Sequence, residues 1–236
     1  MRISIVVPVL EEASALSALA DSLADRTDFD EVIVVDASRS AELLELYAAP
    51  GGAPHRLAAA GACLVGSPVA SRASQMNIGG DLAGGDIIIF LHADTRLPAV
   101  DLRRSLAPSL PAPGWGRFDV RLDIDAWWAR LIGGAMNLRS RLTGIATGDQ
   151  CIFVSRSLWR RLGGYRDIAL MEDIEICRRL RRIARPHCVR DPAVTSARRW
   201  RRHGVLRTVL TMWLLRFRYW LGADPARLAR VYRDAR

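Results

Sequence analysis

The first hundred residues alternate between short apolar runs and amphipathic segments. The apolar runs are rich in Ile, Val and Leu, as expected of strands that are buried on both faces of a parallel sheet. The segments between them space leucines or alanines for a helix. The predicted strands are 3–7 (ended by Pro8), 31–35, 62–65 and 86–91; the predicted helices are 13–23, 41–48 (followed by a loop at 50–52) and 73–83. This alternation predicts a parallel, doubly wound half-sheet over about the first 95 residues.

The pattern changes after Asp94. Polar and apolar residues then alternate over one segment, and prolines mark the ends of others. The predicted elements are a half-exposed antiparallel strand at 116–123, a helix at 126–142, a strand at 150–154 and a basic helix at 175–183. No repeat or disordered linker interrupts this part of the sequence. We therefore expect one α/β domain over residues 1–202.

Residues 203–236 form a basic tail that we do not expect to be an independent domain. Between Val205 and Leu221 the apolar side chains recur at three- and four-residue steps, so a helix here has one continuous apolar face. Two arginines near the middle of this helix, and the lack of a run of 18 apolar residues, argue against a transmembrane segment. Contact with the membrane interface, or packing on the domain or a partner, fits the tail equally well.

Charge is distributed unevenly along the 236 residues, which carry a net charge of +9. Residues 1–100 have 6 Arg and 13 acidic residues, whereas residues 101–236 have 28 Arg and 12 acidic residues. Arginines concentrated in the C-terminal part indicate contact with phosphate or an anionic membrane, and nucleic acid is not the expected partner. No lysine is present, which excludes a P-loop lysine and a Schiff base.

The cysteines and the N-terminal residues indicate the cell compartment in which we expect the protein. The four cysteines show no CxxC spacing, so free thiols are expected and a zinc site is not. The first eight residues read as a strand and not as a signal peptide. We expect a cytoplasmic protein whose tail could lie on the inner face of the cell membrane.

Polar residues follow three of the four predicted N-terminal strands. Glu11 comes after the first strand, Asp36 after the second, and His92 and Asp94 after the fourth. In an open parallel sheet, ligands bind beyond the carboxyl ends of the strands, so these groups should lie along one edge. Such an edge suits a ribose, a base or a divalent cation that holds a diphosphate, and oxygen ligands favour Mg²⁺ or Mn²⁺ over zinc.

Six short segments carry a resemblance to a known family. They follow one another in the order 7–12 (VPVLEE), 35–38 (VDAS), 72–77 (RASQMN), 90–95 (FLHADT), 148–150 (GDQ) and 172–173 (ED). In this order and spacing they resemble the family 2 glycosyltransferases, and among these a bacterial subgroup with a HADT-type variant of the metal-binding DxD motif. The resemblance covers about residues 3–202. It implies a GT-A fold: a Rossmann-like, mostly parallel central sheet flanked by helices, here with a helical basic C-terminal tail.

The resemblance implies a nucleotide-sugar site and a divalent metal. Arg72 would face the diphosphate, where a guanidinium can bind in a bidentate manner. Asp94 would bind Mg²⁺ or Mn²⁺, and His92, which stands where the motif has its first Asp, is the second candidate ligand. The implied nucleotide-sugar residues are Pro8, Glu11, Asp36, Arg72, Asn77 and Asp94. The cation would neutralise charge on the leaving nucleoside diphosphate.

The resemblance also implies the catalytic base and the sugar contacts. Asp173 is the first candidate for the general base of an inverting transfer, with Glu172 as the alternative. Read without the family, the same pair is an acidic helix N-terminus. Residues near the donor sugar or the acceptor would be Asp149, Gln150, Arg199 and Trp200, the last two within an element similar to the family's (Q/R)xxRW motif.

The implied activity is an inverting, metal-assisted transfer of a sugar, of the hexosyltransferase type, from a UDP- or GDP-linked donor to an unknown hydroxyl acceptor. A nucleotidyltransferase or Rossmann-type cofactor enzyme is disfavoured because no GxGxxG or lysine-bearing glycine-rich loop follows the first strand. A different class also stays open: a degenerate nucleotide-binding module that its basic tail attaches to a membrane or to a partner.

Overall fold

The computed structural model describes residues 1–11, 13–24, 26–38, 62–109 and 114–234, and the statements below concern these residues. Eight strands form one sheet with the order β3-β2-β1-β4-β7-β6-β8-β5. The strands are β1 (Ile3–Val9), β2 (Glu31–Asp36), β3 (Ala62–Gly66), β4 (Ile87–Phe90), β5 (Thr95–Arg96), β6 (Trp115–Leu122), β7 (Phe153–Ser155) and β8 (His187–Thr195). The helices are α1 (Ala13–Leu23), α4 (Arg72–Leu82), α5 (Leu102–Leu106), α6 (Trp127–Thr143), α7 (Arg156–Leu162), α8 (Glu172–Leu180), α9 (Arg198–His203), α10 (Val205–Trp220) and α11 (Pro225–Asp234).

The N-terminal half of the sheet is parallel, as predicted. β1 lies between β2 and β4 and pairs with both in parallel, while β2 pairs in parallel with β3. Pro8 does not end β1, contrary to our prediction, because β4 pairs with β1 only as far as Val6. Beyond that point no partner on this side needs the N–H that proline lacks. The predicted helix at 41–48 and the loop at 50–52 lie outside the described residues.

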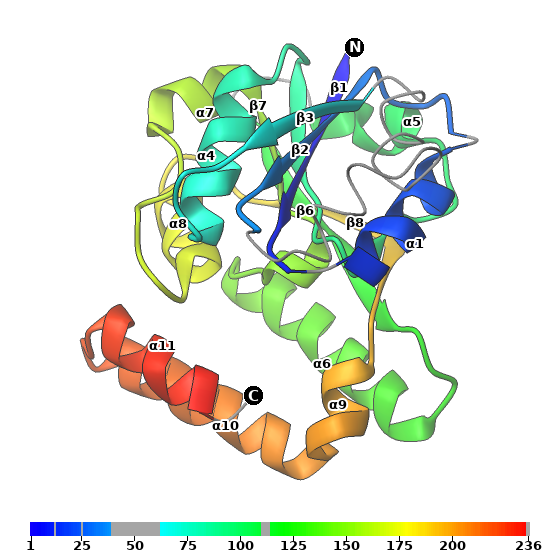
Figure 1. The fold of residues 1–236 in the computed structure, drawn as a ribbon. Coiled ribbons are helices and arrows are strands. Elements are labelled where there is room, and N and C mark those ends of the chain that lie inside the picture. Colours follow the sequence, from blue (N-terminus) through cyan, green and yellow to red (C-terminus); the bar gives the residue numbers. More distant parts are fainter. Residues whose placement is uncertain (12, 25, 39–61, 110–113, 235–236) are drawn as a thin grey trace.

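Helices cover both faces of the sheet (Figure 1). On one face, Ile5 and its odd-numbered neighbours in β1 pack against the leucines of α1 and α5. On the other face, Val6 and the alternate residues of β2 and β4 pack against α4, α7 and α8. The sheet is mixed and mostly parallel and has helices on both faces, so the predicted α/β fold is confirmed.

The second half of the sheet adds antiparallel pairing. β7 runs antiparallel to β4 and to β6, whereas β6 and β8 are parallel. Two predicted boundaries are wrong. The strand expected at 150–154 begins only at Phe153, because residues 148–150 form a 3₁₀ turn before β7. The helix expected at 175–183 begins at Glu172, so the acidic pair Glu172 and Asp173 opens α8 instead of preceding it. A helix that begins at Glu172 has acidic residues in its first turn, where the helix dipole favours them.

The predicted half-exposed character of strand 116–123 is wrong. β6 is buried almost throughout, because α6 covers one of its faces and β7 and β8 flank it. Arg117 is only 1% exposed and pairs with Asp119, which also pairs with Arg141 of α6. The alternation of polar residues therefore marks a buried ion-pair network and not a solvent-facing edge.

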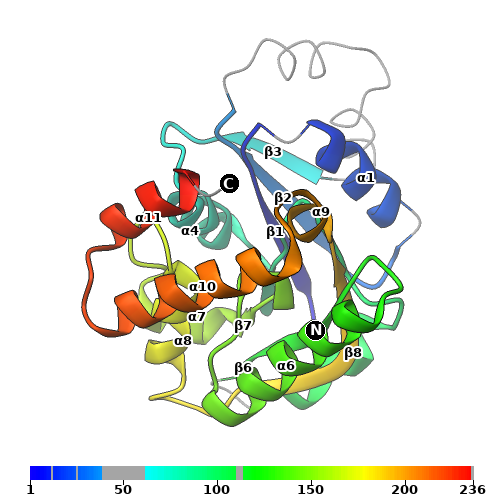
Figure 2. The same ribbon diagram turned by 90° about the horizontal axis from the view of Figure 1, so that it is seen from below.

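The C-terminal residues form three helices below the sheet (Figures 1 and 2). α10 and α11 pack through Leu215 and Leu228 on Met171 and Ile174 at the start of α8. The tail thus packs on the domain, which was one of the alternatives that the sequence left open. None of the helices described is both long and apolar enough to cross a membrane.

Candidate functional site

A buried glutamine fixes the carboxyl ends of β1 and β2. Gln75 of α4 is 2% exposed, and its Nε2 donates hydrogen bonds to the carbonyl oxygens of Val9 (2.6 Å) and Val35 (2.8 Å). These carbonyls lie where the strands leave the sheet, so their pairing sets the start of both following loops. Gln75 belongs to the RASQMN segment of the family resemblance, but our sequence analysis did not assign it a role.

The polar residues after these two strands are linked to each other. The Glu11 N–H donates to Ser38 Oγ (2.7 Å), and the Ser38 N–H donates to Asp36 Oδ1 (2.7 Å). Glu11 has a positive φ of 50°, an unusual conformation for a residue other than glycine. The structure therefore brings two of the predicted nucleotide-sugar residues, Glu11 and Asp36, to one edge of the sheet.

His92, Asp94 and Asp149 form the group that could hold a metal. Ligand atoms of these three residues all lie within 4.8 Å of one another, and each side chain is half-buried. His92 Nδ1 lies 3.4 Å from Asp149 Oδ1. Burial opposes ionisation of Asp149, but the hydrogen bond and charge of His92, with Arg199 and Arg72 further away, lower its pKa to about 2. Two carboxylates and one imidazole are ligands that suit Mn²⁺ or Mg²⁺.

Gly148 joins this cluster to the predicted catalytic base. A Cβ atom at Gly148 would lie 2.1 Å from His92 Nε2, so only glycine lets the backbone approach the imidazole ring. The Gly148 N–H donates to Asp173 Oδ2 (3.3 Å), and the next residue in the chain is Asp149. Gly148 thus lies against His92, donates to Asp173 and precedes Asp149, so these three side chains surround one short turn.

Asp173 and Glu172 differ in their surroundings. The second carboxylate oxygen of Asp173 accepts from the Ile174 N–H (2.7 Å), so backbone groups orient both of its oxygens. Glu172 is buried, with Arg72 Nη1 3.9 Å from its Oε1. Burial, followed by the charge of Asp173, raises the pKa of Glu172, and Arg72 opposes this. Burial thus makes Glu172 harder to ionise than a glutamate in water.

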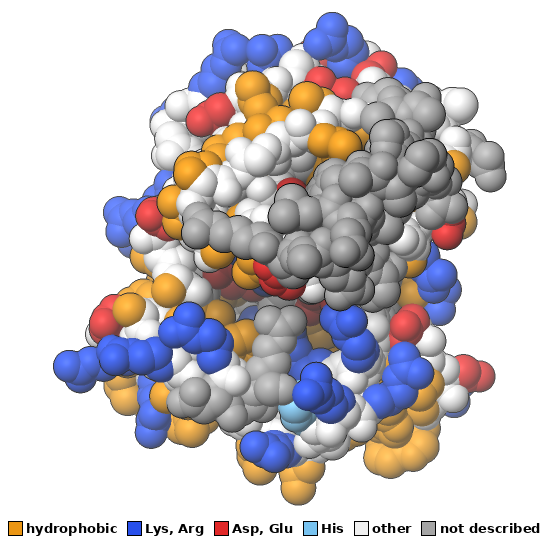
Figure 3. Space-filling view, viewed as in Figure 1, with side chains coloured by type: hydrophobic (Ala, Val, Ile, Leu, Met, Phe, Trp, Pro, Cys, Tyr) orange, Lys and Arg blue, Asp and Glu red, His pale blue; other side chains and the backbone are white. Residues whose placement is uncertain are grey.

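The largest cavity near these residues lies between the sheet edge and the C-terminal helices. It has a volume of about 1800 Å³ with its open mouth. Pro8, Arg72 and Glu172 line one side, and Arg230 and Tyr232 of α11 line the other. In Figure 3 acidic side chains lie in the hollow between the upper part of the molecule and the arginine-rich lower helices. The predicted nucleotide-sugar residues Pro8 and Arg72 therefore share a cavity with the ED segment.

Three other predicted site residues have structural partners. Asn77 Nδ2 donates a hydrogen bond to the Tyr165 carbonyl (2.9 Å), and Asn77 Oδ1 accepts one from the Tyr165 N–H (2.8 Å). Gln150 is fully buried and donates to Ser140 Oγ (3.0 Å). Trp200 packs in a small cluster of apolar side chains contributed by β6 and α6. For Asn77 and Gln150, contact with a sugar nucleotide would require the side chain to give up these partners.

Sequence reasoning missed basic residues close to Asp173. Burial and then Arg216 of α10 lower the pKa of Arg139 of α6 to about 10, while Asp173 acts in the opposite direction. Buried guanidinium nitrogens of Arg139 and Arg216 have no hydrogen-bond partner among the described residues. No local motif marks either arginine, because each belongs to an amphipathic helix with many others. Only the approach of α6 and α10 shows that the charge of Arg139 interacts with those of Arg216 and Asp173.

The chain is similar to known glycosyltransferases in sequence and in fold. The model of the family described as "Glycosyl transferase family 2" matches residues 4–109. A search of curated proteins by sequence gave no match. The TarS structure from S. aureus in complex with UDP is similar with a TM-score of 0.63 and 16% identity, over 83% of this chain and 60% of that one. The mannosyltransferase PcManGT from Pyrobaculum calidifontis, in complex with GDP-Man and Mn²⁺, gives a TM-score of 0.59 and 21% identity, over 87% and 62%.

A third similar structure is the glucosyl-3-phosphoglycerate synthase from Mycobacterium tuberculosis in complex with Mg²⁺ and UDP. Its TM-score is 0.53 at 19% identity, over 83% of this chain and 69% of that one. The chain thus spans about three fifths of the length of the TarS 1–349 structure and of PcManGT. At these identities the structures establish the shared fold. Residues 4–109 thus match glycosyl transferase family 2, and the chain shares the GT-A fold of these structures.

Proposed function

We propose that the chain is an inverting glycosyltransferase that moves a sugar from a UDP- or GDP-linked donor to a hydroxyl acceptor with the help of Mg²⁺ or Mn²⁺. The observation that carries the proposal is the turn at Gly148. It places a metal-type cluster of His92, Asp94 and Asp149 next to Asp173, whose carboxylate the backbone orients. The named ligands of the similar structures, UDP and GDP-Man, are of the same chemical class as the proposed donor.

Each group has a chemical role in this reaction. A bound divalent cation supplies positive charge that stabilises the leaving nucleoside diphosphate. Arg72 adds charge at the first turn of α4, in the cavity that Pro8 also lines. Asp173 takes the proton of the acceptor hydroxyl as that oxygen attacks the anomeric carbon from the side opposite the leaving group. Glu172 suits this role less, because burial makes it harder to ionise.

The test separates metal binding from proton transfer. Asp94→Asn should weaken nucleoside diphosphate binding in the presence of Mn²⁺, measured by calorimetry. Asp173→Asn should leave this binding intact and lower the transfer or slow hydrolysis of a donor sugar by 10²-fold or more, the order expected for loss of a general base. Asp125→Asn, a change at a side chain that is 92% exposed, serves as the control. Full activity in both site variants would refute the assignment.

Peripheral contact with the inner face of the cell membrane also belongs to this proposal. Helices α10 and α6 lie side by side on the lower side of the molecule (Figure 2) and expose large apolar side chains that the domain does not cover. These are Leu206, Leu210, Trp213, Leu214, Phe217 and Trp220 of α10, Leu221 directly after it, and Trp127, Leu131, Leu138 and Leu142 of α6. Trp213 and Trp220 are 70% and 69% exposed, and tryptophans next to arginines are typical of helices in a membrane interface.

Co-sedimentation with vesicles of phosphatidylcholine and phosphatidylglycerol tests this contact. Trp213→Ser should reduce binding, whereas Leu82→Ser, a change on α4 that is 55% exposed, should not. Failure of the wild type to bind at low salt would rule the contact out.

The alternative function, a degenerate nucleotide-binding module held at a membrane by its tail, has the same apolar face in its favour. Calorimetry with nucleoside diphosphate and Mn²⁺ distinguishes the two. Binding that EDTA abolishes, together with turnover, supports the enzyme; membrane binding without nucleotide binding supports the module. Binding to DNA with a steep salt dependence would contradict both.

A further inference from the structure

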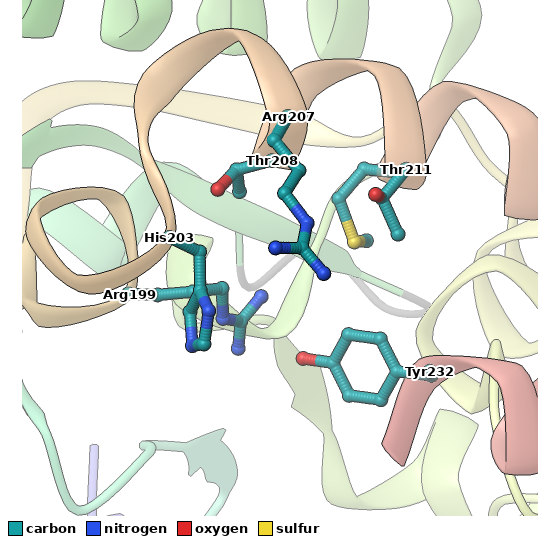
Figure 4. Close-up of a pocket in the computed structure, with 7 residues that line it drawn as sticks. Arg199, His203, Arg207, Thr208, Thr211 and Tyr232 are labelled. Atoms are coloured by element: carbon teal, nitrogen blue, oxygen red, sulfur yellow. The ribbon is translucent and has the colours of Figure 1, made fainter. Parts of the chain in front are cut away.

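A second cavity lies between the three C-terminal helices (Figure 4). Its volume, with its open mouth included, is about 320 Å³. Its lining residues come from α9, α10 and α11 and are Arg199, His203, Arg207, Thr208, Thr211, Met212 and Tyr232. Figure 4 shows the guanidinium groups of Arg199 and Arg207 and the hydroxyl of Tyr232 turned toward the same space.

The described residues that line the cavity include two arginines and no acidic side chain. Within the part of the chain that the structure describes, no carboxylate oxygen lies within 4.0 Å of a charged nitrogen of Arg199, His203 or Arg207. The Arg199 guanidinium instead lies over the ring of Tyr232, 5.3 Å from its centroid. Two guanidinium groups that converge without a counter-charge repel each other, and an anion between them would turn this repulsion into attraction.

The position of the cavity relates it to the proposed transfer site. Tyr232 also lines the 1800 Å³ cavity that contains Pro8, Arg72 and Glu172, so it forms a wall shared by the two. Arg199 is close enough to Asp149 for its charge to favour the ionised carboxylate. A molecule anchored between Arg199 and Arg207 could therefore extend past Tyr232 into the larger cavity, where the proposed nucleotide sugar binds.

We propose that this cavity is a subsite for a phosphate group of the acceptor, bound by Arg199, Arg207, His203 and the hydroxyl of Tyr232. The inference rests on the proposed function and specifies its acceptor as a phosphate-bearing alcohol. Phosphate oxygens match the donor geometry of guanidinium groups, and a second arginine, an imidazole and a phenol supply further donors.

The phosphate could belong to a lipid headgroup or to a soluble molecule. The opposite side of α10 carries the exposed apolar residues described above, so a headgroup at a membrane surface would lie close to the cavity. The same donors would bind a phosphate monoester in solution. Two probes distinguish these sources: inorganic phosphate, and vesicles of phosphatidylcholine that contain phosphatidic acid, a phosphate monoester.

The matched variants are Arg207→Gln and Arg202→Gln. Both arginines are exposed and adjoin the loop between α9 and α10, but only Arg207 lines the cavity, and neither change removes buried packing. The titrations with inorganic phosphate and with vesicles contain EDTA, so that no metal ion at the His92, Asp94 and Asp149 cluster can bind the phosphate. Arg207→Gln should weaken binding of the effective probe about tenfold, as for loss of one charged hydrogen-bonding group, and Arg202→Gln less than about twofold. Tyr232→Phe should weaken it about threefold.

The outcomes separate the inference from the function on which it rests. Binding of either probe that depends on Arg207 supports the subsite. Arg207-dependent binding of inorganic phosphate indicates a soluble acceptor. Arg207-dependent binding of the vesicles alone indicates a lipid acceptor. Equal losses in the two arginine variants, or no binding of either probe by wild type, would overturn it. A parallel titration with nucleoside diphosphate and Mn²⁺ reports on the proposed function independently, because Arg207 lies outside the larger cavity.

Discussion

The close approach of Gly148 to His92 makes Gly148→Ala an informative perturbation. The new Cβ would lie 2.1 Å from Nε2 and 2.2 Å from Cε1 of the imidazole. Carbon atoms in contact are normally about 3.5–4.0 Å apart, so the ring has to retreat by roughly 1.5 Å. It can do so, because these atoms are at the far end of a side chain. The retreat, however, would disrupt the 3.4 Å contact between His92 and Asp149.

The expected damage is therefore greater for ligand binding than for folding. Overpacking of this kind destabilises a protein by about 1–3 kcal/mol. Misplacing a metal ligand weakens metal affinity by about 10- to 100-fold. Gly134→Ala is the matched control: a Cβ at Gly134, in the interior of α6, has no heavy atom within 4 Å. It should stabilise the helix by about 0.5–1 kcal/mol and leave ligand binding unchanged.

Urea unfolding and calorimetry with nucleoside diphosphate and Mn²⁺ measure the two effects. A double-mutant cycle with His92→Ala shows whether the imidazole is their cause, since removing the ring should also remove the clash. The coupling energy between the two sites should then be about 1 kcal/mol or more. If Gly148→Ala binds and unfolds like wild type, or if the two changes are additive, the reasoning about this turn is wrong.

Three further predictions concern groups that hold the site and the sheet. Gln75→Leu removes two buried hydrogen bonds to the carbonyl groups of Val9 and Val35 and should lower the free energy of unfolding by about 1–3 kcal/mol in urea; a loss below 0.5 kcal/mol would contradict this. Asp119→Asn leaves the charge of Arg117 buried and should destabilise by about 3–5 kcal/mol by the same assay, an effect that unchanged stability would refute. Burial opposes ionisation of Asp28, but its hydrogen bond with Arg26 lowers the pKa below 3.8. The contribution of ionised Asp28 to the free energy of unfolding should thus be complete above pH 3.8 and disappear as the pH falls through the folded-state pKa. Asp28→Asn should therefore destabilise the protein at pH 7 and have little effect in strong acid. A pH-independent effect would count against the pairing of Asp28 with Arg26.

The elements that the sequence predicted well are those with strong local periodicity. β1, β2 and β4 are continuous apolar runs that fit only the buried interior of a parallel sheet, and α4 follows its predicted bounds within one residue. The prediction for β6 was wrong because Arg117 and Asp119 imitate a solvent-facing edge. Their partner Arg141 lies more than 20 residues further along the chain, where no local pattern connects it to them.

The candidate site was also predicted only in part from the sequence. Carboxylates at strand ends and the order of the family segments pointed to Asp94 and Asp173. The sequence did not predict that Asp149 would join His92 in the metal-type cluster, or that Arg207 and Tyr232 would share a cavity. The positions of strands and helices follow from side-chain periodicity, which the backbone geometry of a few neighbouring residues determines. Which charged groups face one another depends on distances of a few ångströms between segments far apart in the chain, and only the packing of helices on the sheet decides those distances.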